Sequence, residues 1–289
     1  MNGSAPACQV LQTLLLAELS NIKHWRKVAI QGRDPEGVHQ LRISLRKMRS
    51  ALTIFSPVIR PAYRQQWRRR LKQLAKQLDA ARDLDVFLLT HFSGTASDSQ
   101  LYGALDKKKA RLYKQLCSTL KSGKFNKRRR QLKKALAQTN WQKKYCCRQT
   151  LSLRSLAQQQ LNTLYQNLQT QTQELHLNDE AALHQLRISF KQLRYGCEFL
   201  EPALDGTTSQ SFINMMKALQ DQLGDIHDAA VQQTMLADLP VAAQDEFQTI
   251  LDESQRNSEH LKKTLRQQLR RFNNMPPPWQ NLSSVSEFG

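Results

Sequence analysis

The sequence has few of the residues that interrupt helices or that build disulfide-bonded and membrane proteins. Only 10 Gly and 9 Pro occur among 289 residues, which argues against a chain made of turns and short strands. The five cysteines form no Cys-x-x-Cys pair and no ligand spacing with His, so we expect reduced thiols, no metal site and no cofactor. No stretch approaches 18 apolar residues, and the N-terminus lacks a signal-like segment. We therefore expect a soluble, cytoplasmic protein without membrane insertion.

Acidic residues are also scarce, and this shortage is uneven. The chain contains 43 Lys and Arg against 24 Asp and Glu, a formal net charge of +19. Residues 1–145 hold 31 basic and 8 acidic residues, whereas residues 146–289 hold 12 basic and 16 acidic residues. Such an excess of positive charge favours a polyanionic partner: nucleic acid, polyphosphate or an acidic membrane surface. Nothing in the sequence indicates a protein partner.

One motif is present twice at a constant spacing. The sequence His-Gln-Leu-Arg-Ile-Ser occupies residues 39–44 and again residues 184–189, an offset of 145 residues. A weaker match between 71–86 and 216–231 has the same offset. A shared offset indicates that a whole unit is duplicated, which predicts two similar domains related by a pseudo-twofold axis. We expect these domains at 8–145 and 146–272, followed by a disordered tail at 273–289.

Leu, Gln, Lys, Arg and Ala dominate the composition, and the apolar residues recur with helical spacing. The predicted fold class is therefore all-α. The expected helices cover 8–31, 36–56, 60–91 with a break near Asp83, 99–122, 124–149, 150–176, 179–200, 208–237 and 242–272.

The second helix of each repeat has an apolar side and a basic side. Leu41, Leu45, Met48, Leu52 and Phe55 form the apolar stripe of the first copy, and Leu186, Phe190, Leu193 and Leu200 form that of the second. The opposite stripes carry His39, Arg42, Arg46 and Arg49 in the first copy and His184, Arg187, Lys191 and Arg194 in the second. From residue 39 to residue 49 the basic stripe is about 15 Å long, enough to meet several charges of a linear polyanion.

The third helices repeat this division. Leu71, Leu74, Leu78 and Ala81 form the apolar stripe of the first copy, and Met216, Leu219, Leu223 and Ile226 form that of the second. Opposite lie Arg68, Lys72, Lys76 and Arg82 in the first copy and Lys217 and His227 in the second, where Asp221 replaces Lys76. Asp83 and Asp228 either orient neighbouring Arg or His side chains or cap a following short helix.

A basic helix face is often only solvated surface, and a histidine near a helix N-terminus often only packs against its neighbours. Here the same basic positions recur in both copies, whereas Lys47 corresponds to Gln192 and Ser50 to Tyr195. The retained positions therefore favour a binding function. The charge runs at 107–109 and 127–130 are interpreted as auxiliary, through solvated charge or nonspecific attraction.

The doubled motif, at 38–49 and 183–194, together with the Leu-x-x-x-Leu-x-x-x-(Arg or His)-Asp patterns at 74–83 and 219–228, resembles the CHAD family, the conserved histidine α-helical domain. The resemblance covers about residues 8–272. It implies two four-helix bundles around a basic central groove or pore that binds inorganic polyphosphate, and a protein that can associate with polyphosphate granules. The implied ligand-binding residues are His39, Arg42, Arg46, Arg49, Lys72, Arg82, His184, Arg187, Lys191, Arg194, Lys217 and His227, with Lys47, Arg68 and Lys76 as auxiliary basic residues.

Many members of this family carry a CYTH triphosphatase domain with a Glu-x-Glu-x-Lys signature, and this sequence contains neither the signature nor residues to form that barrel. Triphosphate hydrolysis needs acidic groups that hold a metal ion. We therefore expect a binding protein, not an enzyme, with no catalytic residues. Two alternatives remain: a nucleic-acid-binding protein, although no aromatic residues alternate with the basic ones, and a phosphate-transfer or hydrolysis enzyme with His39 and His184 as acid and base.

Overall fold

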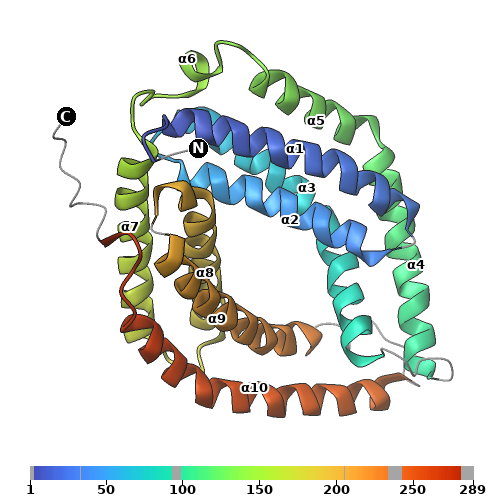
Figure 1. Ribbon diagram of the computed structural model, residues 1–289. Helices are drawn as coiled ribbons and strands as arrows, with labels where there is room; N and C mark the ends of the chain where they lie inside the picture. The colour runs from blue at the N-terminus through green and yellow to red at the C-terminus, as the bar shows by residue number, and fades with distance from the viewer. Residues whose placement is uncertain (1–2, 33, 93–98, 205, 234–242, 281–289) are drawn as a thin grey trace. The chain divides into compact units, whose positions relative to one another are not determined.

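The computed structural model describes residues 3–32, 34–92, 99–204, 206–233 and 243–280, and every regular element in these ranges is a helix (Figure 1). The chain divides into two compact units. The first unit comprises Leu11–Gln149 with Met235–Ile250, and the second comprises Met1–Val10, Thr150–Thr234 and Leu251–Gly289. The prediction of an all-α fold is confirmed. Each unit thus joins separate stretches of the chain, and the expected domains at 8–145 and 146–272 stay a prediction.

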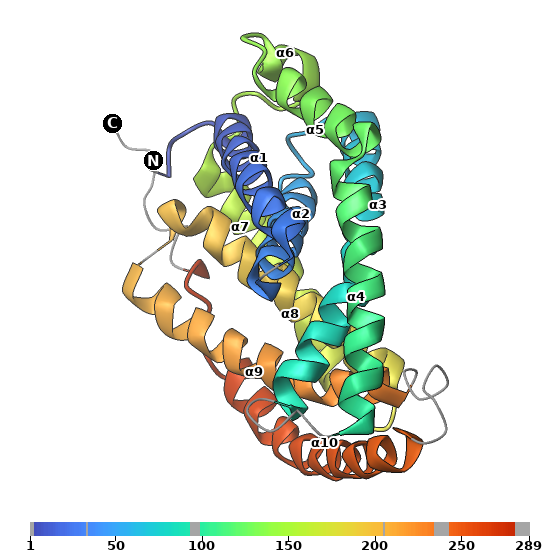
Figure 2. The same cartoon turned by 90° about the vertical axis from the view of Figure 1, so that its right-hand side faces the viewer.

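The described residues of the first unit form helices α1 to α6 and the start of α10 (Gln244–Asn273); α2 packs on α3, and α3 packs on α4 (Figure 2). Their bounds are α1 (Ala7–Gln31), α2 (Pro35–Ile54), α3 (Pro61–His91), α4 (Gln100–Lys121), α5 (Gly123–Leu136) and α6 (Trp141–Tyr145). A short antiparallel bridge joins Ile59 to Cys146 after α6.

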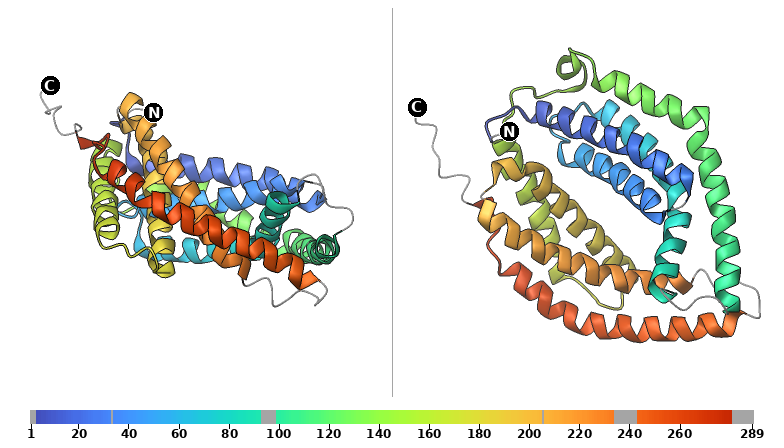
Figure 3. Two further views of the ribbon diagram at one scale, coloured as in Figure 1. Left: turned by 90° about the horizontal axis from the view of Figure 1, so that it is seen from below. Right: turned by 45° about the vertical axis from the view of Figure 1, so that its right-hand side comes forward.

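In the second unit, α8 packs between α7 and α9 (Figure 3). The bounds are α7 (Leu153–Gln173), α8 (Glu180–Leu200), the 3₁₀ helix η1 (Glu201–Ala203), α9 (Gly206–Gln233) and α10 (Gln244–Asn273), of which the part from residue 251 onward belongs to this unit. Pro6 pairs with Ser152 at the start of this unit. Helices α2 and α8 begin 145 residues apart, as do α3 and α9.

The helix ends follow local chemistry. Before α2, the carboxylate of Asp34 accepts a hydrogen bond from the Glu36 amide, and Pro35 occupies the first helical position. Asp179 caps α8 in the same way, through the Ala182 amide. Gly32 ends the first helix with a φ of +67°, a conformation that favours glycine.

A second glycine allows α1 and α2 to approach closely. A Cβ atom on Gly37 would lie 2.6 Å from the backbone nitrogen of Ala29 and 2.9 Å from its Cα. These neighbours are backbone atoms and cannot move aside like a flexible side chain. The basic face of α2 is therefore held in position by a contact that requires glycine.

The predicted apolar stripes form the core. Leu41, Leu45, Leu52 and Phe55 on α2 are fully buried, and Met48 is almost so. The same holds for the other predicted stripe residues, which are Leu71, Leu74, Leu78, Ala81, Leu186, Phe190, Leu193, Leu200, Met216, Leu219, Leu223 and Ile226. The basic residues on the opposite side of α2, His39, Arg42, Arg46 and Arg49, are half-buried.

Two expected helix boundaries were wrong. Helix α3 continues through Asp83 without a break, because Leu84, Phe87 and Leu88 extend its buried side. The single helix expected at 124–149 is instead α5 and α6. The break follows Leu136, and the buried side chains of Trp141 and Tyr145 hold α6 as a separate turn.

The segment after α10 also differs from the expected tail. Trp279 is fully buried, contacts Tyr165 and Phe212, and donates a hydrogen bond from Nε1 to Oδ1 of Asn162 at 2.8 Å. Residues 274–280 are therefore packed against the second unit by an indole with a satisfied N–H group. The rest of the expected tail, 281–289, lies outside the described residues.

All five cysteines are free thiols: Cys8, Cys146 and Cys197 are buried, Cys117 is partly buried and Cys147 is exposed. Burial raises the pKa of the Cys197 thiol. Among the described residues, no helix has the length and apolar content needed to cross a bilayer.

Candidate anion-binding sites

The predicted basic residues of the first unit lie along the packed helices α2 and α3, and we call them the α2/α3 cluster. It comprises His39, Arg42, Arg46, Arg49, Arg68 and Arg82. Arg42 is fixed across the two helices, because its Nε atom donates to Oδ1 of Asp79 at 2.8 Å and its Nη1 lies 4.0 Å from Oδ1 of Asp83. This charge-assisted pair positions one guanidinium group before any ligand arrives.

The remaining cations of this cluster repel one another. Burial lowers the pKa of His39, and the positive charges of Arg82, Arg46 and Arg42 lower it further, against the opposing effect of Glu36. Burial also lowers the pKa of Arg49, as do Arg68 and Arg46. An anion bound among these groups relieves this repulsion.

Arg49 carries a further sign of an unfilled site. Its Nε atom is buried and has no hydrogen-bond acceptor among the described residues. Asp79 acts on Arg49 only through its charge, since the hydrogen bond that this carboxylate accepts comes from Arg42. A buried N–H group without an acceptor is costly, and an anion beside Arg49 removes that cost.

The corresponding residues of the second unit lie along α8 and α9, and we call them the α8/α9 cluster: His184, Arg187, Lys191, Arg194 and His227. The rings of His184 and His227 are in contact, with centroids 4.6 Å apart. Burial and the charge of Arg187 lower the pKa of His227 to about 4, with smaller effects from His184 and Lys191. The pKa of His184 is lowered by burial, Arg187 and Lys191. Both rings are therefore neutral at pH 7.

The two clusters differ in how their arginines are held. Asp79 on α3 corresponds to Gly224 on α9, and Nη2 of Arg187 lies 3.6 Å from where a Cβ of Gly224 would be. The carboxylate of Asp228 is more distant, with Oδ1 at 3.9 Å from Nη1 of Arg187. The close carboxylate that fixes Arg42 is therefore replaced by a glycine beside Arg187.

Arg194, unlike Arg49 in the described part of the chain, already has side-chain hydrogen-bond and ion-pair partners within the protein. Its Nε donates to Oε1 of Gln220 at 3.1 Å, and its Nη1 pairs with Glu198. The corresponding Arg49 has Thr53 and Ala75 at those positions. The α8/α9 cluster is also more acidic: burial raises the pKa of Asp225, and so do Asp228 and Asp221. The second site is thus the weaker one for an anion.

Asp83 and Asp228 lie within α3 and α9 and cap no following helix. Each stands about 4 Å from the Arg that corresponds in the two copies. Of the two roles left open for them, the geometry supports orientation of the arginine.

Some predicted residues are not joined to these clusters. Lys72 and Lys76 on α3 and Lys217 on α9 are exposed, and Lys47 on α2 is half-buried. Within the described residues, no hydrogen bond or ion pair connects these four lysines to either cluster. By contrast Arg68, predicted only as auxiliary, lies close enough to affect the pKa of Arg49.

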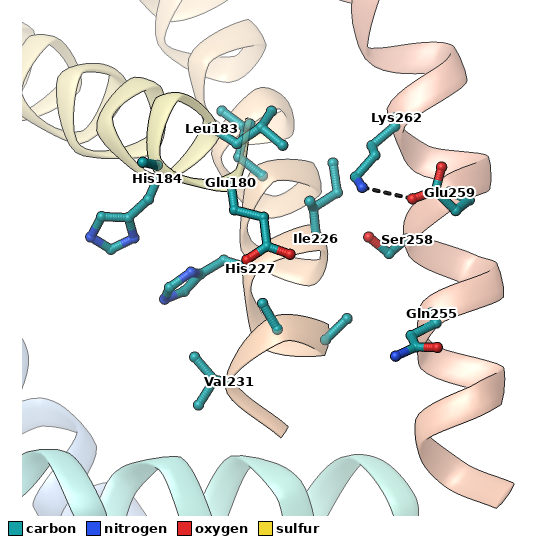
Figure 4. A pocket seen from close by; sticks show the side chains of 14 residues that line it. Glu180, Leu183, His184, Ile226, His227, Val231, Gln255, Ser258, Glu259 and Lys262 are labelled. Carbon is teal, nitrogen blue, oxygen red and sulfur yellow. Dashed lines mark hydrogen bonds and ion pairs between the residues drawn. The ribbon is translucent and has the colours of Figure 1, made fainter. Parts of the chain in front are cut away.

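Sequence patterns also missed a cavity beside the histidine pair. About 620 Å³ in volume, it lies between the start of α8, the end of α9 and α10 (Figure 4). His184 and His227 line one side, Leu183, Leu223 and Ile226 line another, and on α10 Lys262 is paired with Glu259 at 2.6 Å. Its walls come from three separate helices, so no single periodic pattern reveals it. No group of His, Cys, Asp and Glu suited to a metal ion occurs in the described part of the chain.

The helical fold, with basic residues along the second and third helices of each unit, defines a class of all-α domain. The model of the CHAD domain matches residues 13–237, and the chain belongs to this family. Similar solved structures include the crystal structure of the CHAD domain from the plant Ricinus communis, with 22% identity, a TM-score of 0.70, and coverage of 96% of this chain and 90% of that one. PptA from Streptomyces chartreusis matches with 16% identity, a TM-score of 0.68, and coverage of 92% and 100%. A comparison with curated proteins found no match.

Proposed function

We propose that this protein binds inorganic polyphosphate, chiefly through the α2/α3 cluster. The observation that carries the proposal is the crowding of like charges there: burial, Arg68 and Arg46 all lower the pKa of Arg49, whose Nε has no acceptor among the described residues. A chain of phosphates offers many acceptor oxygens along one line, which suits a row of guanidinium groups. Apart from the imidazole of His39 the cluster has no ring, so it offers no platform for stacking bases.

The α8/α9 cluster is proposed as a second, weaker contact for the same kind of ligand. The duplicated motif at 39–44 and 184–189 and the matching starts of α2 and α8 support a repeat of the binding element. The family resemblance implies that both copies act on one polyphosphate chain. We extend the proposal to a cytoplasmic protein that associates with polyphosphate granules.

We also propose that the protein binds without catalysis. His39 and His184, the residues considered as acid and base, each lie among arginines or lysines that lower their pKa. Such neighbours fit electrostatic binding of a phosphate chain, and they leave little proton affinity for a general base at pH 7.

The test is a titration with labelled long-chain polyphosphate and with orthophosphate at two salt concentrations. Orthophosphate should bind weakly, because it engages only one or two side chains. Removing two charge-assisted contacts, with Arg46→Ala and Arg49→Ala, should weaken polyphosphate binding about 100-fold, at about 1.5 kcal/mol for each contact.

The matched control removes two exposed cations from α4, with Lys107→Ala and Arg111→Ala. If both double variants lose the same polyphosphate affinity, binding depends only on general charge attraction, which contradicts the proposal. In parallel, the protein should release no phosphate from tripolyphosphate with Mg²⁺ or Mn²⁺ beyond a heat-treated control. Turnover that disappears in His39→Ala would instead identify an enzyme.

A further inference from the structure

A second basic groove lies in the first unit, between α3 and α5. It has a volume of about 680 Å³, and five of its ten lining residues are cations. These cations are Arg69, Arg70, Lys124, Lys127 and Arg128. Four more lining residues are glutamines, namely Gln65, Gln66, Gln73 and Gln131. Among the described residues, no carboxylate lines this groove.

The groove lies on a different side of α3 from the α2/α3 cluster. Each residue turns a helix by about 100°, so Arg69 is about a quarter turn from Arg68, and Gln66 and Gln73 are nearly opposite it. Arg68 and Asp79 belong to the side that packs with the basic residues of α2. The groove is therefore a separate site, not an extension of the first.

Its positive charge is not neutralised by the protein. The sequence contains no Asp or Glu from Lys107 to Gln173, a stretch that includes all of α5. On α3 the nearest acidic residue is Asp79, which is bonded to Arg42. Across the described ranges, none of the five groove cations forms an ion pair. A surface of this kind attracts a polyanion.

The glutamines distinguish this groove from the first site. Each amide has both donors and an acceptor, so it suits a ligand in which phosphates alternate with neutral hydrogen-bonding groups. A ribose backbone has this composition, because its 2′-hydroxyl group is both donor and acceptor, whereas a deoxyribose backbone offers acceptors only. Phosphate contacts to either backbone are made by Arg, Lys and Gln alike. Polyphosphate has acceptors only and leaves the glutamine carbonyls without a donor.

The lining also contains no aromatic ring. Single strands are held largely by stacking on aromatic residues, whereas duplexes are contacted along their phosphates and sugars. We infer that the α3/α5 groove binds the phosphodiester backbone of duplex nucleic acid. Basic residues on α5 run from Lys124 to Lys134, about 15 Å, which is the axial rise of about four nucleotides on one strand.

The experiment measures binding of labelled 20-base-pair RNA and DNA duplexes of one sequence, with long-chain polyphosphate as a third ligand. The groove variant combines Arg69→Ala, Lys124→Ala and Lys127→Ala, all at exposed positions. The control variant combines Lys107→Ala, Arg111→Ala and Lys114→Ala on α4, which are also exposed and remove the same charge.

We expect the groove variant to bind at least one of the two duplexes at least 10-fold more weakly than the control variant does. The slope of log K against log salt should fall by up to about 3, at about 0.9 for each phosphate that the protein no longer neutralises. Gln66→Ala with Gln131→Ala should weaken duplex binding without changing this slope. The RNA and DNA arms identify which backbone is bound.

Equal duplex binding by the groove and control variants would overturn the inference. So would a loss of polyphosphate affinity as large as the loss for the duplex, because that result assigns the groove to polyphosphate. The outcome is independent of the proposed function, since Arg46→Ala with Arg49→Ala tests the α2/α3 cluster separately.

Discussion

The unequal pairing of the two clusters predicts unequal contributions to polyphosphate binding. The perturbations are two triple variants at corresponding positions: Arg42→Ala, Arg46→Ala and Arg49→Ala in the first unit, and Arg187→Ala, Lys191→Ala and Arg194→Ala in the second. Both remove three formal charges. Arg194 already bonds to Gln220 and Glu198, whereas Nε of Arg49 has no acceptor in the described part of the chain.

The magnitude follows from the number of phosphates that each triple can engage. When a flexible polyanion has three phosphates fewer neutralised by the protein, the slope of log K against log salt should fall by about 2, at about 0.7 for each phosphate. In the second unit Arg194 is bonded through both Nε and Nη1 and contributes little, whereas Arg42, among the described residues, donates a hydrogen bond only from Nε and its Nη groups can contact a phosphate. The second triple therefore engages at most two phosphates, which gives a change of about 1. At about 1.5 kcal/mol for each charge-assisted interaction, the first triple should cost about ten times more affinity than the second.

The assay is fluorescence anisotropy with labelled polyphosphate between 50 and 300 mM salt, with circular dichroism to confirm that both variants remain folded. Equal changes of the salt slope in the two triple variants, or a larger change in the second, would refute this reasoning. Such a result would show that the bonds of Arg194 within the protein do not prevent it from contacting polyphosphate. No effect at all from the second triple would confine binding to the first unit and contradict a shared ligand.

Two further predictions concern protonation and packing. Polyphosphate affinity should be nearly constant from pH 8 to 7 and rise below about pH 6.5, because the pKa values of His39 and His184 are lowered in the free protein and a bound anion raises them. The variant His39→Ala should show a smaller rise. A flat affinity profile in the parent protein would refute this prediction. Gly37→Ala should lower the free energy of unfolding by about 1–3 kcal/mol, since its Cβ meets the backbone of α1, whereas Gly103→Ala on α4, with no atom within 4 Å, should be neutral or stabilising in the same denaturation assay.

Much of the fold could be predicted because the spacing of apolar residues along the sequence determines which side of a helix is buried. The leucine stripes on α2 and α8, the caps at Asp34 and Asp179, and the basic sides all follow from spacing alone. The expected break at Asp83 failed, because a single charged residue at the edge of a long apolar stripe does not end a helix. Proline inside a helix does so far more reliably, and α3 contains none after Pro61.

Contacts between distant segments were beyond the reach of the sequence. Trp279 in a segment rich in proline gives no periodic signal, yet its ring fills a space between Tyr165 and Phe212. The buried Asp85 is similar, for it accepts from Tyr113 at 2.6 Å and lies 3.0 Å from Nζ of Lys109, both on α4. Patterns within one helix show which residues are polar, but they do not identify the partners that another helix supplies.

Asp79 in the first copy corresponds to Gly224 in the second, so the arginines of the two clusters are held differently. Arg42 is held by its carboxylate, so little side-chain freedom remains to be lost when a phosphate binds it. Arg187 passes over a glycine instead of a carboxylate, and the carboxylate that it pairs with, Asp228, stands farther off, at 3.9 Å. Under the proposed function, a phosphate at the α2/α3 cluster would meet a guanidinium group that is already fixed, and one at the α8/α9 cluster would meet a guanidinium group without so close a carboxylate. Binding at Arg42 would therefore cost less side-chain entropy than binding at Arg187.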